Sequence, residues 1–508
     1  MVVKCNSVGL FGMDGYMVEV EADVSSGIAA FDIVGLPDAA VRESRDRVRT
    51  AMHNCGYGFP VSRITVNLAP ADIKKGGPLY DLPILVAIMR ATAQINTDLS
   101  ECAFLGELSL SGEVRSVCGV LPMAIKAKEA GIKKLFVPSE DSAEGAVVEG
   151  IEVYPVKNVP QLIAHLQGRI LIEKAQTPKD FTSPGFIPDF SQVKGQYEVK
   201  RAMEVAAAGG HNILLIGPPG SGKSMLAKRL PSILPEMTFE ERIDASKIHS
   251  IAGLLPKGQS LISERPFRSP HHTVSSVGLS GGGTVPRPGE VSLAHNGVLF
   301  LDELPEFSRS ALEVLRQPME DGKVTVSRVH STVSYPCSVM LVAAMNPCPC
   351  GYYEHPKKNC TCSENAIHKY LAKVSGPLLD RIDIHVEVPA VEYDDLTDYN
   401  EAEPSEKIKE RVNKARRIQT ERFKGTDIVC NARITADVFR QVCATDEGAQ
   451  QVLRKAFDKL GLSARAYDTV LKVSRTIADL EGSEIIRADH VLEAVQYRTL
   501  DKKYWSRG

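Results

Sequence analysis

Hydrophobic and polar residues alternate differently in three regions of the chain. Up to about residue 170, short β-branched runs such as 64–68 and 135–137 alternate with helix-like stretches such as 122–130. Between about 190 and 395, helical pieces separate four short and almost wholly apolar runs, at 213–216, 298–301, 339–344 and 384–388. Such continuous apolarity is typical of strands buried on both faces, so this region is predicted to form a parallel sheet covered by helices.

Beyond about residue 405 the strand signals stop. Five helix-like stretches follow, at 407–424, 436–443, 448–460, 464–480 and 487–497, with breaks at Gly425, Gly461 and Gly482. A segment rich in proline and glycine, which includes Pro178 and Pro184, precedes the central region and is interpreted as a linker. The chain is therefore predicted to be an α/β protein with an N-terminal α+β domain (1–172), a linker (173–189), a parallel-sheet core (190–395) and a C-terminal helical lid (396–508).

Charge and composition exclude several classes of protein. The 508 residues carry 60 Lys and Arg against 63 Asp and Glu, so nucleic acid would have to be bound by a local basic surface. No apolar run approaches the ~18 residues that a membrane helix needs, and the first ten residues do not resemble a secretory signal. A cytoplasmic protein without a membrane partner is expected.

A phosphate-binding loop follows the first apolar run of the central region. The sequence from Gly217 to Ser224 fits the pattern G-x-x-x-x-G-K-[ST] and lies between a predicted strand and a predicted helix. Glycines allow the backbone N–H groups to approach phosphate, while the lysine reaches the terminal phosphates and the serine hydroxyl joins a Mg²⁺ shell. The predicted loop residues are Gly217, Pro218, Pro219, Gly220, Ser221, Gly222, Lys223 and Ser224.

Polar residues end two further apolar runs. Asp302 and Glu303 follow the run 298–301, where Asp302 is predicted to hold Mg²⁺ and Glu303 to activate a water molecule. Asn346 follows the run 339–344 and could hydrogen-bond both the γ-phosphate and that water. Taken alone, each would be read as a polar strand exit or an Asn-Pro turn, but together with the phosphate loop they predict an ATP site with Mg²⁺.

Four of the eleven cysteines crowd into fifteen residues: Cys348, Cys350, Cys360 and Cys362. In a reducing compartment such a cluster favours metal over disulfides, and four thiolates can close a tetrahedral Zn²⁺ shell. The one-residue gaps are tighter than the usual two, and His355 could replace one sulfur. A structural zinc is predicted, with a fully reduced four-thiol loop as the alternative.

These motifs, followed by an all-helical lid, resemble the AAA+ ATPases of the Mg-chelatase/MCM branch. The resemblance is closest to the ComM/YifB family, and it is carried by FSQVKGQ at 190–196, AAAGGHN at 206–212, RSPHHT at 268–273, GLSGGG at 278–283 and GEVSLAHNG at 289–297. It implies that Arg381 is an arginine finger acting on the neighbouring subunit, that Arg465 is a sensor-two residue contacting the nucleotide, and that Val193 and Gly195 lie near adenine. An arginine finger in trans implies a homo-oligomeric ring, expected to be a hexamer.

The family also carries a β-hairpin before the third apolar run, here within 322–335. Lys323, Arg328 and His330 lie along it and are the predicted DNA-binding residues, although a plain hairpin with exposed basic residues is the competing interpretation. The segment 268–283 is expected to be a pore loop. The helix 407–424 holds eight basic and two acidic residues, and it either faces DNA or is simply solvated. The segment 38–49, with four arginines around a predicted helix, either faces DNA or a partner or is a charged helix surface.

The N-terminal region resembles the Lon protease domain. The resemblance is carried by KGGPLYD at 75–81, by 106–114 and by 127–138. Lon-type hydrolysis needs a serine nucleophile and a lysine base, but Leu79 and Met123 stand at the corresponding positions. A proteolytically inactive binding or ring-assembly module is therefore expected.

The leading hypothesis is an ATP-driven hexameric DNA motor. Resemblance to ComM implies helicase activity, with branch migration of recombination intermediates in natural transformation (competence), and a single-stranded or branched DNA partner. The alternatives are a Mg-chelatase-like remodelling ATPase, a nucleotide-gated DNA-binding scaffold and an ATP-dependent protease.

Overall fold

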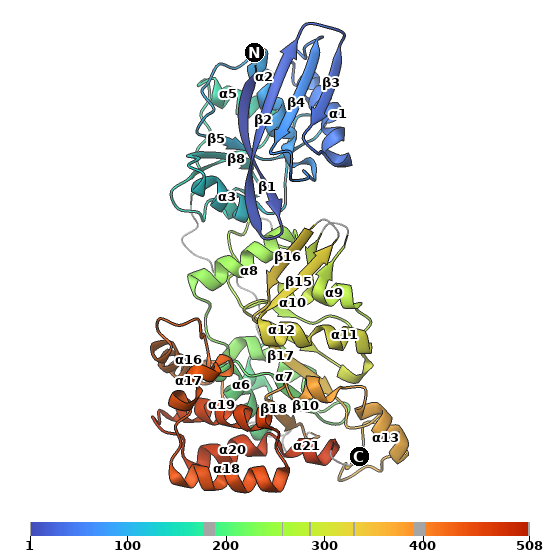
Figure 1. Ribbon diagram of the computed structural model, residues 1–508, viewed down its shortest axis with the longest axis vertical. Helices are drawn as coiled ribbons and strands as arrows, with labels where there is room; N and C mark the ends of the chain where they lie inside the picture. The colour runs from blue at the N-terminus through green and yellow to red at the C-terminus, as the bar shows by residue number, and fades with distance from the viewer. Residues whose placement is uncertain are drawn as a thin grey trace. The chain divides into compact units, whose positions relative to one another are not determined.

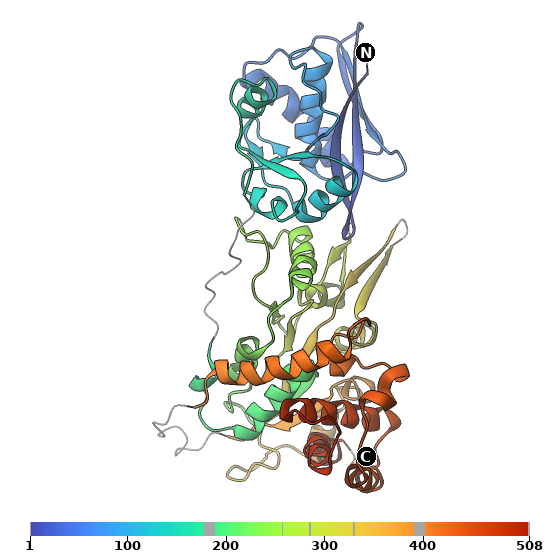
Figure 2. The same cartoon turned by 90° about the vertical axis from the view of Figure 1, so that its left-hand side faces the viewer.

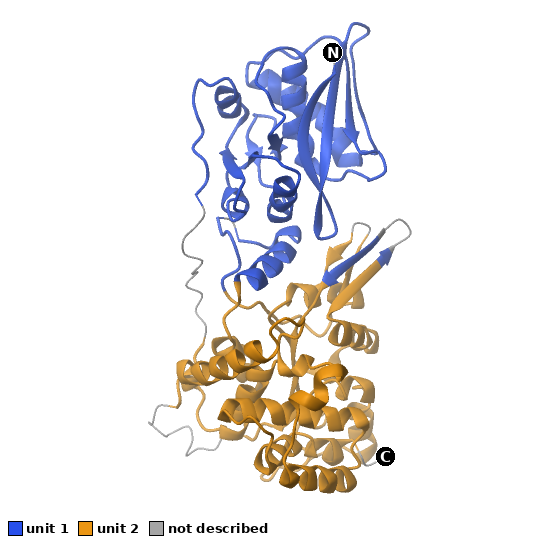
Figure 3. Ribbon diagram, turned by 60° about the vertical axis from the view of Figure 1, so that its left-hand side comes forward, with its two compact units in different colours: residues 1–183, 239–263, 327–335 blue, residues 184–238, 264–326, 336–508 orange. Residues whose placement is uncertain are grey.

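The computed structural model describes residues 2–176, 188–256, 258–283, 286–328, 331–390 and 402–505. The chain divides into two compact units, which Figure 3 shows in different colours. Unit 1 comprises residues 1–183, 239–263 and 327–335, and unit 2 comprises residues 184–238, 264–326 and 336–508. Most of the predicted linker, and the predicted boundary between core and lid at 395, lie outside the described residues.

Unit 1 is built on a seven-stranded sheet of order β3-β4-β2-β1-β5-β8-β9 (Figure 1). Its strands are β1 (Val3–Phe11), β2 (Asp14–Ser25), β3 (Ala30–Val34), β4 (Arg63–Ala69), β5 (Cys102–Phe104), β8 (Lys134–Pro138) and β9 (Glu152–Val156). The β1–β2 and β2–β4 pairs are antiparallel, whereas the other four pairs are parallel. The runs 64–68 and 135–137 lie in β4 and β8, as predicted.

Helices cover the sheet of unit 1. They are α1 (Ala39–Asn54), α2 (Asp81–Ala91), α3 (Val120–Glu129), α4 (Ser142–Gly145) and α5 (Val159–Leu166), and a further helix of the unit, α8 (Phe239–Ile251), packs against α3. The apolar residues of α2 are buried from Leu82 to Met89, which explains a helix with almost no polar face. A short antiparallel pair, β6 (Glu107–Leu108) and β7 (Val114–Arg115), completes the unit, so the predicted mixed α/β character is confirmed.

Unit 2 contains a five-stranded, all-parallel sheet of order β11-β14-β17-β10-β18. Its strands are β10 (Ile213–Ile216), β11 (Phe267–Arg268), β14 (Val298–Leu301), β17 (Met340–Met345) and β18 (Ile384–Glu387). All residues of β10, β14 and β17 are buried, so the apolar runs are indeed central strands. Because the strands are parallel, the polar residues that follow them meet at one edge of the sheet.

The C-terminal part of unit 2 is helical, as expected. Its helices are α16 (Ser405–Arg422), α17 (Ala436–Val442), α18 (Glu447–Leu460), α19 (Ala464–Glu481), α20 (Ala488–Gln496) and α21 (Thr499–Tyr504). Gly461 and Gly482 end α18 and α19 with φ of 64° and 73°, a conformation that glycine adopts without strain. The long helix α16 packs along α6 (Tyr197–Gly209) and α19 (Figure 2).

Short helices and strands lie between the sheet strands of unit 2 along the chain. The helices are α7 (Lys223–Arg229), α9 (Ser276–Ser280), α10 (Glu290–Leu293), α11 (Arg309–Val314), α12 (Arg316–Asp321), α13 (Glu364–Leu371) and α14 (Gly376–Leu379). β12 (Gly281–Gly282) pairs with β13 (Arg287–Pro288). β15 (Lys323–Arg328) pairs with β16 (Ser331–Pro336), which is the predicted hairpin, and residues 327–335 of this hairpin belong to unit 1. Across the part of the chain that is described, no helix is both long and apolar enough to span a membrane.

Candidate functional site

The phosphate loop connects β10 to α7. Gly220 and Gly222 adopt φ of 77° and 89°, which lets the chain turn back around an open space. Lys223 Nζ lies over this turn and donates to the carbonyl oxygens of Gly217 (2.7 Å) and Pro218 (2.8 Å). The ammonium group is thus held at the centre of the loop, where a phosphate group could take the place of these carbonyl acceptors.

Ser224 and Asp302 come together beside the loop. Leu301 is the last residue of β14 and pairs with Ala343 in the adjacent strand β17, which in turn pairs with β10. This register brings Asp302 to the start of α7, and the Ser224 hydroxyl donates to Asp302 Oδ2 over 2.6 Å. A hydroxyl and a carboxylate at one point are the hard oxygen ligands that Mg²⁺ prefers.

Asn346 completes the edge of the sheet. It follows β17, and its Oδ1 lies 3.2 Å from Lys223 Nζ. Glu303 has φ of 53°, and its side chain is 58% exposed next to Asp302. Burial lowers the pKa of Lys223 to about 8, with Asp302 acting in the opposite direction. The structure thus brings together Lys223, Ser224, Asp302 and Asn346, four of the residues predicted from sequence.

The segment before α6 is fastened to the phosphate loop. The Gln196 side chain donates to the Ser221 carbonyl (2.7 Å), and Lys200 Nζ donates to the Val193 carbonyl. Val193 is buried, and Gly195 has φ of 59° in the turn that leads to Gln196. Val193 and Gly195 therefore lie on a segment that contacts the phosphate loop.

The two predicted arginines share one partner. The Nη2 atoms of Arg381 and Arg465 both donate to Oε1 of Glu320, although the two arginines lie on different elements. Both guanidinium groups lower the pKa of Glu320, with the hydrogen bond from Arg465 as the largest cause. Sequence reasoning missed Glu320, because an acidic residue at the end of α12 carries no motif.

The four cysteines form a compact cluster. The Sγ atoms of Cys348, Cys350 and Cys360 lie 3.4, 3.7 and 3.6 Å apart, and that of Cys362 lies within 4.8 Å of each of them. Tetrahedral Zn–S bonds of about 2.3 Å place sulfurs about 3.8 Å apart, so the donor set fits this ion. Gly351, inside the cluster loop, packs against the phosphate loop: a Cβ there would lie 2.3 Å from Pro219 Cδ.

The predicted DNA-binding residues are only partly described. Lys323 is exposed at the start of β15, whereas the Arg328 side chain and the whole of His330 lie outside the described residues. On α16, several basic residues have partners in unit 2. Arg411 pairs with Glu204 and Glu403, Arg422 with Asp479, and Lys409 with Glu236. These contacts favour a packing role for these residues of α16 over a DNA-facing one.

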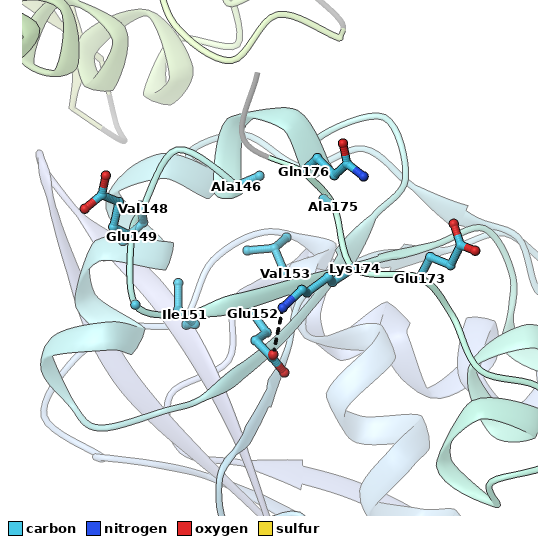
Figure 4. A pocket seen from close by; sticks show the side chains of 11 residues that line it. Ala146, Val148, Glu149, Ile151, Glu152, Val153, Glu173, Lys174, Ala175 and Gln176 are labelled. Carbon is cyan, nitrogen blue, oxygen red and sulfur yellow. Dashed lines mark hydrogen bonds and ion pairs between the residues drawn. The ribbon is translucent and has the colours of Figure 1, made fainter. Parts of the chain in front are cut away.

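The N-terminal unit offers no Lon-type catalytic pair at the predicted positions. Leu79 and Met123 belong to the hydrophobic core and are 9% and 0% exposed. On α1, Arg47 donates to both carboxylate oxygens of the buried Asp81, at 2.6 and 3.1 Å, which assigns this arginine to internal structure. A cavity of about 780 Å³ lies beside β9 (Figure 4), lined by Glu149, Glu152, Glu173 and Lys174 among others, and none of its lining residues belongs to the phosphate loop.

Comparisons with known proteins agree with this geometry. Residues 189–396 match the model of "Magnesium chelatase, subunit ChlI", 20–141 that of "Subunit ChlI of Mg-chelatase", and 402–498 that of "Magnesium chelatase, subunit ChlI C-terminal". The chain is 41% identical over 493 residues to a protein named YifB from Escherichia coli, covering 97% of this chain and 96% of that one. It is 40% identical over 501 residues to Competence protein ComM from Haemophilus influenzae, covering 96% of each chain.

A weaker similarity, 27% identity over 176 residues, relates the chain to Lon protease 2 from Bacillus subtilis and covers 31% of this chain and 32% of that one. The two full-length similarities, by contrast, extend across both units, and the three family models follow one another along the chain. The chain therefore belongs to the ComM/YifB family, within the AAA+ ATPases related to Mg-chelatase.

Proposed function

We propose that this protein is an ATP-hydrolysing motor that acts on DNA as a hexameric ring in the cytoplasm. The observation that carries the proposal is the meeting of Lys223, Ser224, Asp302 and Asn346 at one edge of a parallel sheet. A cation, a hydroxyl, a carboxylate and an amide in this arrangement suit a nucleoside triphosphate with its metal ion.

Each group has a distinct part in this proposal. The backbone of the loop from Gly217 to Gly222 cradles the phosphates, and Lys223 neutralises their terminal charge. Ser224 and Asp302 hold Mg²⁺, Glu303 takes a proton from the attacking water, and Asn346 orients that water. The segment containing Val193 and Gly195 lies along the adenine.

The proposal that protomers form a ring rests on Arg381 and Arg465. Arg381 and Arg465 share Glu320, so both guanidinium groups converge on one anionic group. A guanidinium presents a fixed fork of donors to phosphoryl oxygens, and an arginine finger supplied by a neighbouring subunit requires a closed assembly. We propose that both arginines face the γ-phosphate at a seam between protomers of a hexamer.

DNA is proposed as the substrate on two grounds. One is the relative named Competence protein ComM, whose name concerns competence, and the activity that we propose is branch migration of recombination intermediates during natural transformation. The other is the β15–β16 hairpin with Lys323, Arg328 and His330, whose basic side chains could grip phosphates without reading bases. Single-stranded or branched DNA is the expected partner.

The cysteine cluster is proposed to bind one structural Zn²⁺. The sulfur separations of 3.4 to 3.7 Å match the edges of a tetrahedral thiolate site. The ion would fix the chain just after Asn346, and through Gly351 it would hold that chain against Pro219 of the phosphate loop. Its role is to brace the nucleotide site rather than to take part in the reaction.

The test is a strand-movement assay on a labelled branched DNA with ATP and Mg²⁺. The wild-type protein should move the branch, and Lys223→Ala should abolish both ATP hydrolysis and movement. Lys228→Ala, an exposed lysine on the same helix, is the matched control and should retain both activities. ATP hydrolysis that DNA stimulates but that moves no strand would favour a nucleotide-gated scaffold.

A Mg-chelatase-like remodelling function is the second candidate. The family models that match 189–396 and 402–498 carry that name, and this is the observation in its favour. ATP-dependent insertion of Mg²⁺ into a porphyrin by the purified protein with a chelatase catalytic subunit would support it. Proteolysis is not proposed, because Leu79 and Met123 supply neither a hydroxyl nor an amine.

A further inference from the structure

The short segment between α6 and β10 connects two remote parts of unit 2. It is the end of the AAAGGHN motif, residues 209–212. The side chain of His211 is fully buried, with Nδ1 3.3 Å from Asp383 Oδ2 and Nε2 2.8 Å from Thr476 Oγ1. Asp383 directly precedes β18, and Thr476 lies on α19, so one imidazole ring joins the parallel sheet to the helical part of the unit.

Asn212 makes a second connection, to the backbone of Arg381. Its side-chain amide donates to the carbonyl oxygen of Arg381 (2.9 Å), and its Oδ1 accepts from the N–H of Leu341 in β17 (2.8 Å). The backbone N–H of Asn212 also donates to Asp383 Oδ2 (3.1 Å). These contacts follow from strand order, because Asn212 directly precedes β10, which pairs with both β17 and β18. The backbone at Arg381 is therefore tied to the sheet through one amide side chain.

The two glycines of the motif make room for these contacts. A Cβ at Gly209 would lie 2.3 Å from two atoms of the His211 ring and 2.5 Å from Thr476 Oγ1. Gly210 ends α6 with φ of 71°, a conformation that other residues adopt only with strain. The chain can therefore leave α6 and place His211 against α19 only with glycine at both positions.

The two connections lead to the two arginines that share Glu320. Asn212 holds the backbone of Arg381, and Arg465 lies on the same helix as Thr476, eleven residues earlier. Eleven residues make about three turns of an α-helix, or ~16 Å, so the side chains of Arg465 and Thr476 project from the same side of α19. A shift of α19 against the sheet would move one arginine relative to the other, and the contacts of residues 211 and 212 oppose this shift.

We propose that His211 and Asn212 are positioning residues that hold Arg381 and Arg465 in one arrangement, so that both guanidinium groups reach the same phosphate of the neighbouring protomer. Both residues act through the arginines rather than on the nucleotide. A misplacement of about 1 Å can lower a rate by about 100-fold, so fixing the two elements that carry the arginines has a large effect on hydrolysis. This inference rests on the proposed function, because it takes Arg381 as a finger that acts on the next protomer.

The first experiment compares His211→Ala with a matched pair of variants at its partner. Thr476→Val keeps the shape of the side chain without the hydroxyl, whereas Thr476→Ser keeps the hydroxyl. Steady-state kcat and KM for ATP are measured, and melting temperatures confirm folding. Because the arginines act mainly in the transition state, kcat should fall by about 10- to 100-fold in His211→Ala and about three- to tenfold in Thr476→Val, with KM within about twofold of the wild type. Thr476→Ser and the control His368→Ala, an exposed histidine on α13, should match the wild type.

The second experiment tests whether His211 acts on the neighbouring site. His211→Ala and Lys223→Ala proteins are mixed one to one under conditions in which protomers exchange. In a mixed ring, the well-placed arginines of a Lys223→Ala protomer can face the intact nucleotide site of a His211→Ala protomer. About a quarter of the seams then hold a complete set, so the mixture should hydrolyse ATP at about a quarter of the wild-type rate, well above either variant alone.

Several results would overturn the inference. A wild-type kcat in His211→Ala would do so, as would a KM that rises in proportion to the fall in kcat, or equal losses in Thr476→Ser and Thr476→Val. A mixture of Arg381→Ala with Lys223→Ala separates this failure from a failure of the proposed function. If that mixture regains activity and the mixture with His211→Ala does not, only the positioning role is wrong. If neither mixture regains activity, Arg381 does not act on the next protomer, and the proposed ring mechanism fails with the inference.

Discussion

The buried ammonium of Lys223 makes ATP binding depend on pH in a direction that can be worked out. Removal from water disfavours the charged form and lowers the pKa of this lysine to about 8, from 10.5 in an exposed lysine. A triphosphate needs the charged form, because only the ammonium neutralises its terminal phosphate. Raising the pH through 8 should therefore weaken the binding of ATP to the free protein.

The size of the effect follows from the protonated fraction of Lys223. With a pKa of about 8, this fraction falls from about 0.9 at pH 7 to about 0.1 at pH 9. If only the protonated form binds, the apparent Kd rises about tenfold over this interval, or ~1.4 kcal/mol. The stability of the nucleotide-free protein should change with pH in the opposite direction. Between pH 8 and 10.5 the unfolded chain binds more protons at Lys223 than the folded chain does, so the contribution of Lys223 to the free energy of unfolding rises with pH.

Isothermal titration with a non-hydrolysable ATP analogue and Mg²⁺ at pH 7, 8 and 9 measures the change. Repeating the pH 8 titration in two buffers of different ionisation enthalpy should reveal an uptake of about half a proton per nucleotide. Lys223→Arg is the control, since a guanidinium stays charged throughout this range and its affinity should not vary with pH. A wild-type Kd that is equal at pH 7 and 9, or an equal loss of affinity in Lys223→Arg, would refute the reasoning.

Three other perturbations test neighbouring parts of the site. Cys360→Ser should remove bound zinc, as measured by mass spectrometry of the purified protein, whereas the exposed Cys118→Ser should keep it. Gly351→Ala places a Cβ 2.3 Å from Pro219 Cδ, at a residue whose φ is 83°. It should therefore lower the free energy of unfolding by about 1–2 kcal/mol and also weaken ATP binding. Unchanged ATP affinity would contradict a role for this contact in the nucleotide site. Glu320→Gln weakens two ion pairs and should raise the ATPase rate per protomer by up to about fivefold, whereas a fall would show that Glu320 supports the reaction.

The central sheet could be predicted from sequence because strands buried on both faces leave a continuous apolar signal. The runs 213–216 and 298–301 coincide with β10 and β14, and the run 339–344 differs from β17 by one residue at each end. Once the strands are parallel, residues that directly follow them share an edge. The meeting of Lys223, Asp302 and Asn346 was therefore predictable from the parallel arrangement and from the motifs that follow the strands.

Partners that are remote in sequence could not be predicted. Glu320 lies 61 residues from Arg381 and 145 from Arg465, and only the packing of the helical part on the core brings the three together. The basic residues of α16 resembled a surface for nucleic acid because acidic partners such as Glu204, 207 residues from Arg411, are remote in sequence. A single sequence shows which residues are charged, but tertiary packing determines which of them form ion pairs.

Glu320 bears on how a seam between protomers would be completed. One carboxylate cannot neutralise two guanidinium groups, so the Arg381–Arg465–Glu320 cluster retains a positive charge at a partly exposed position. A phosphoryl group carries more negative charge than a carboxylate and offers three oxygens, so it can bind both forks at once and displace Glu320. The side chains of Arg465 and Glu320 are 45% and 41% exposed, so their ion pair is weak and adds little to the cost of this exchange. We therefore propose that the two arginines bind one phosphate together and approach it from the same protomer.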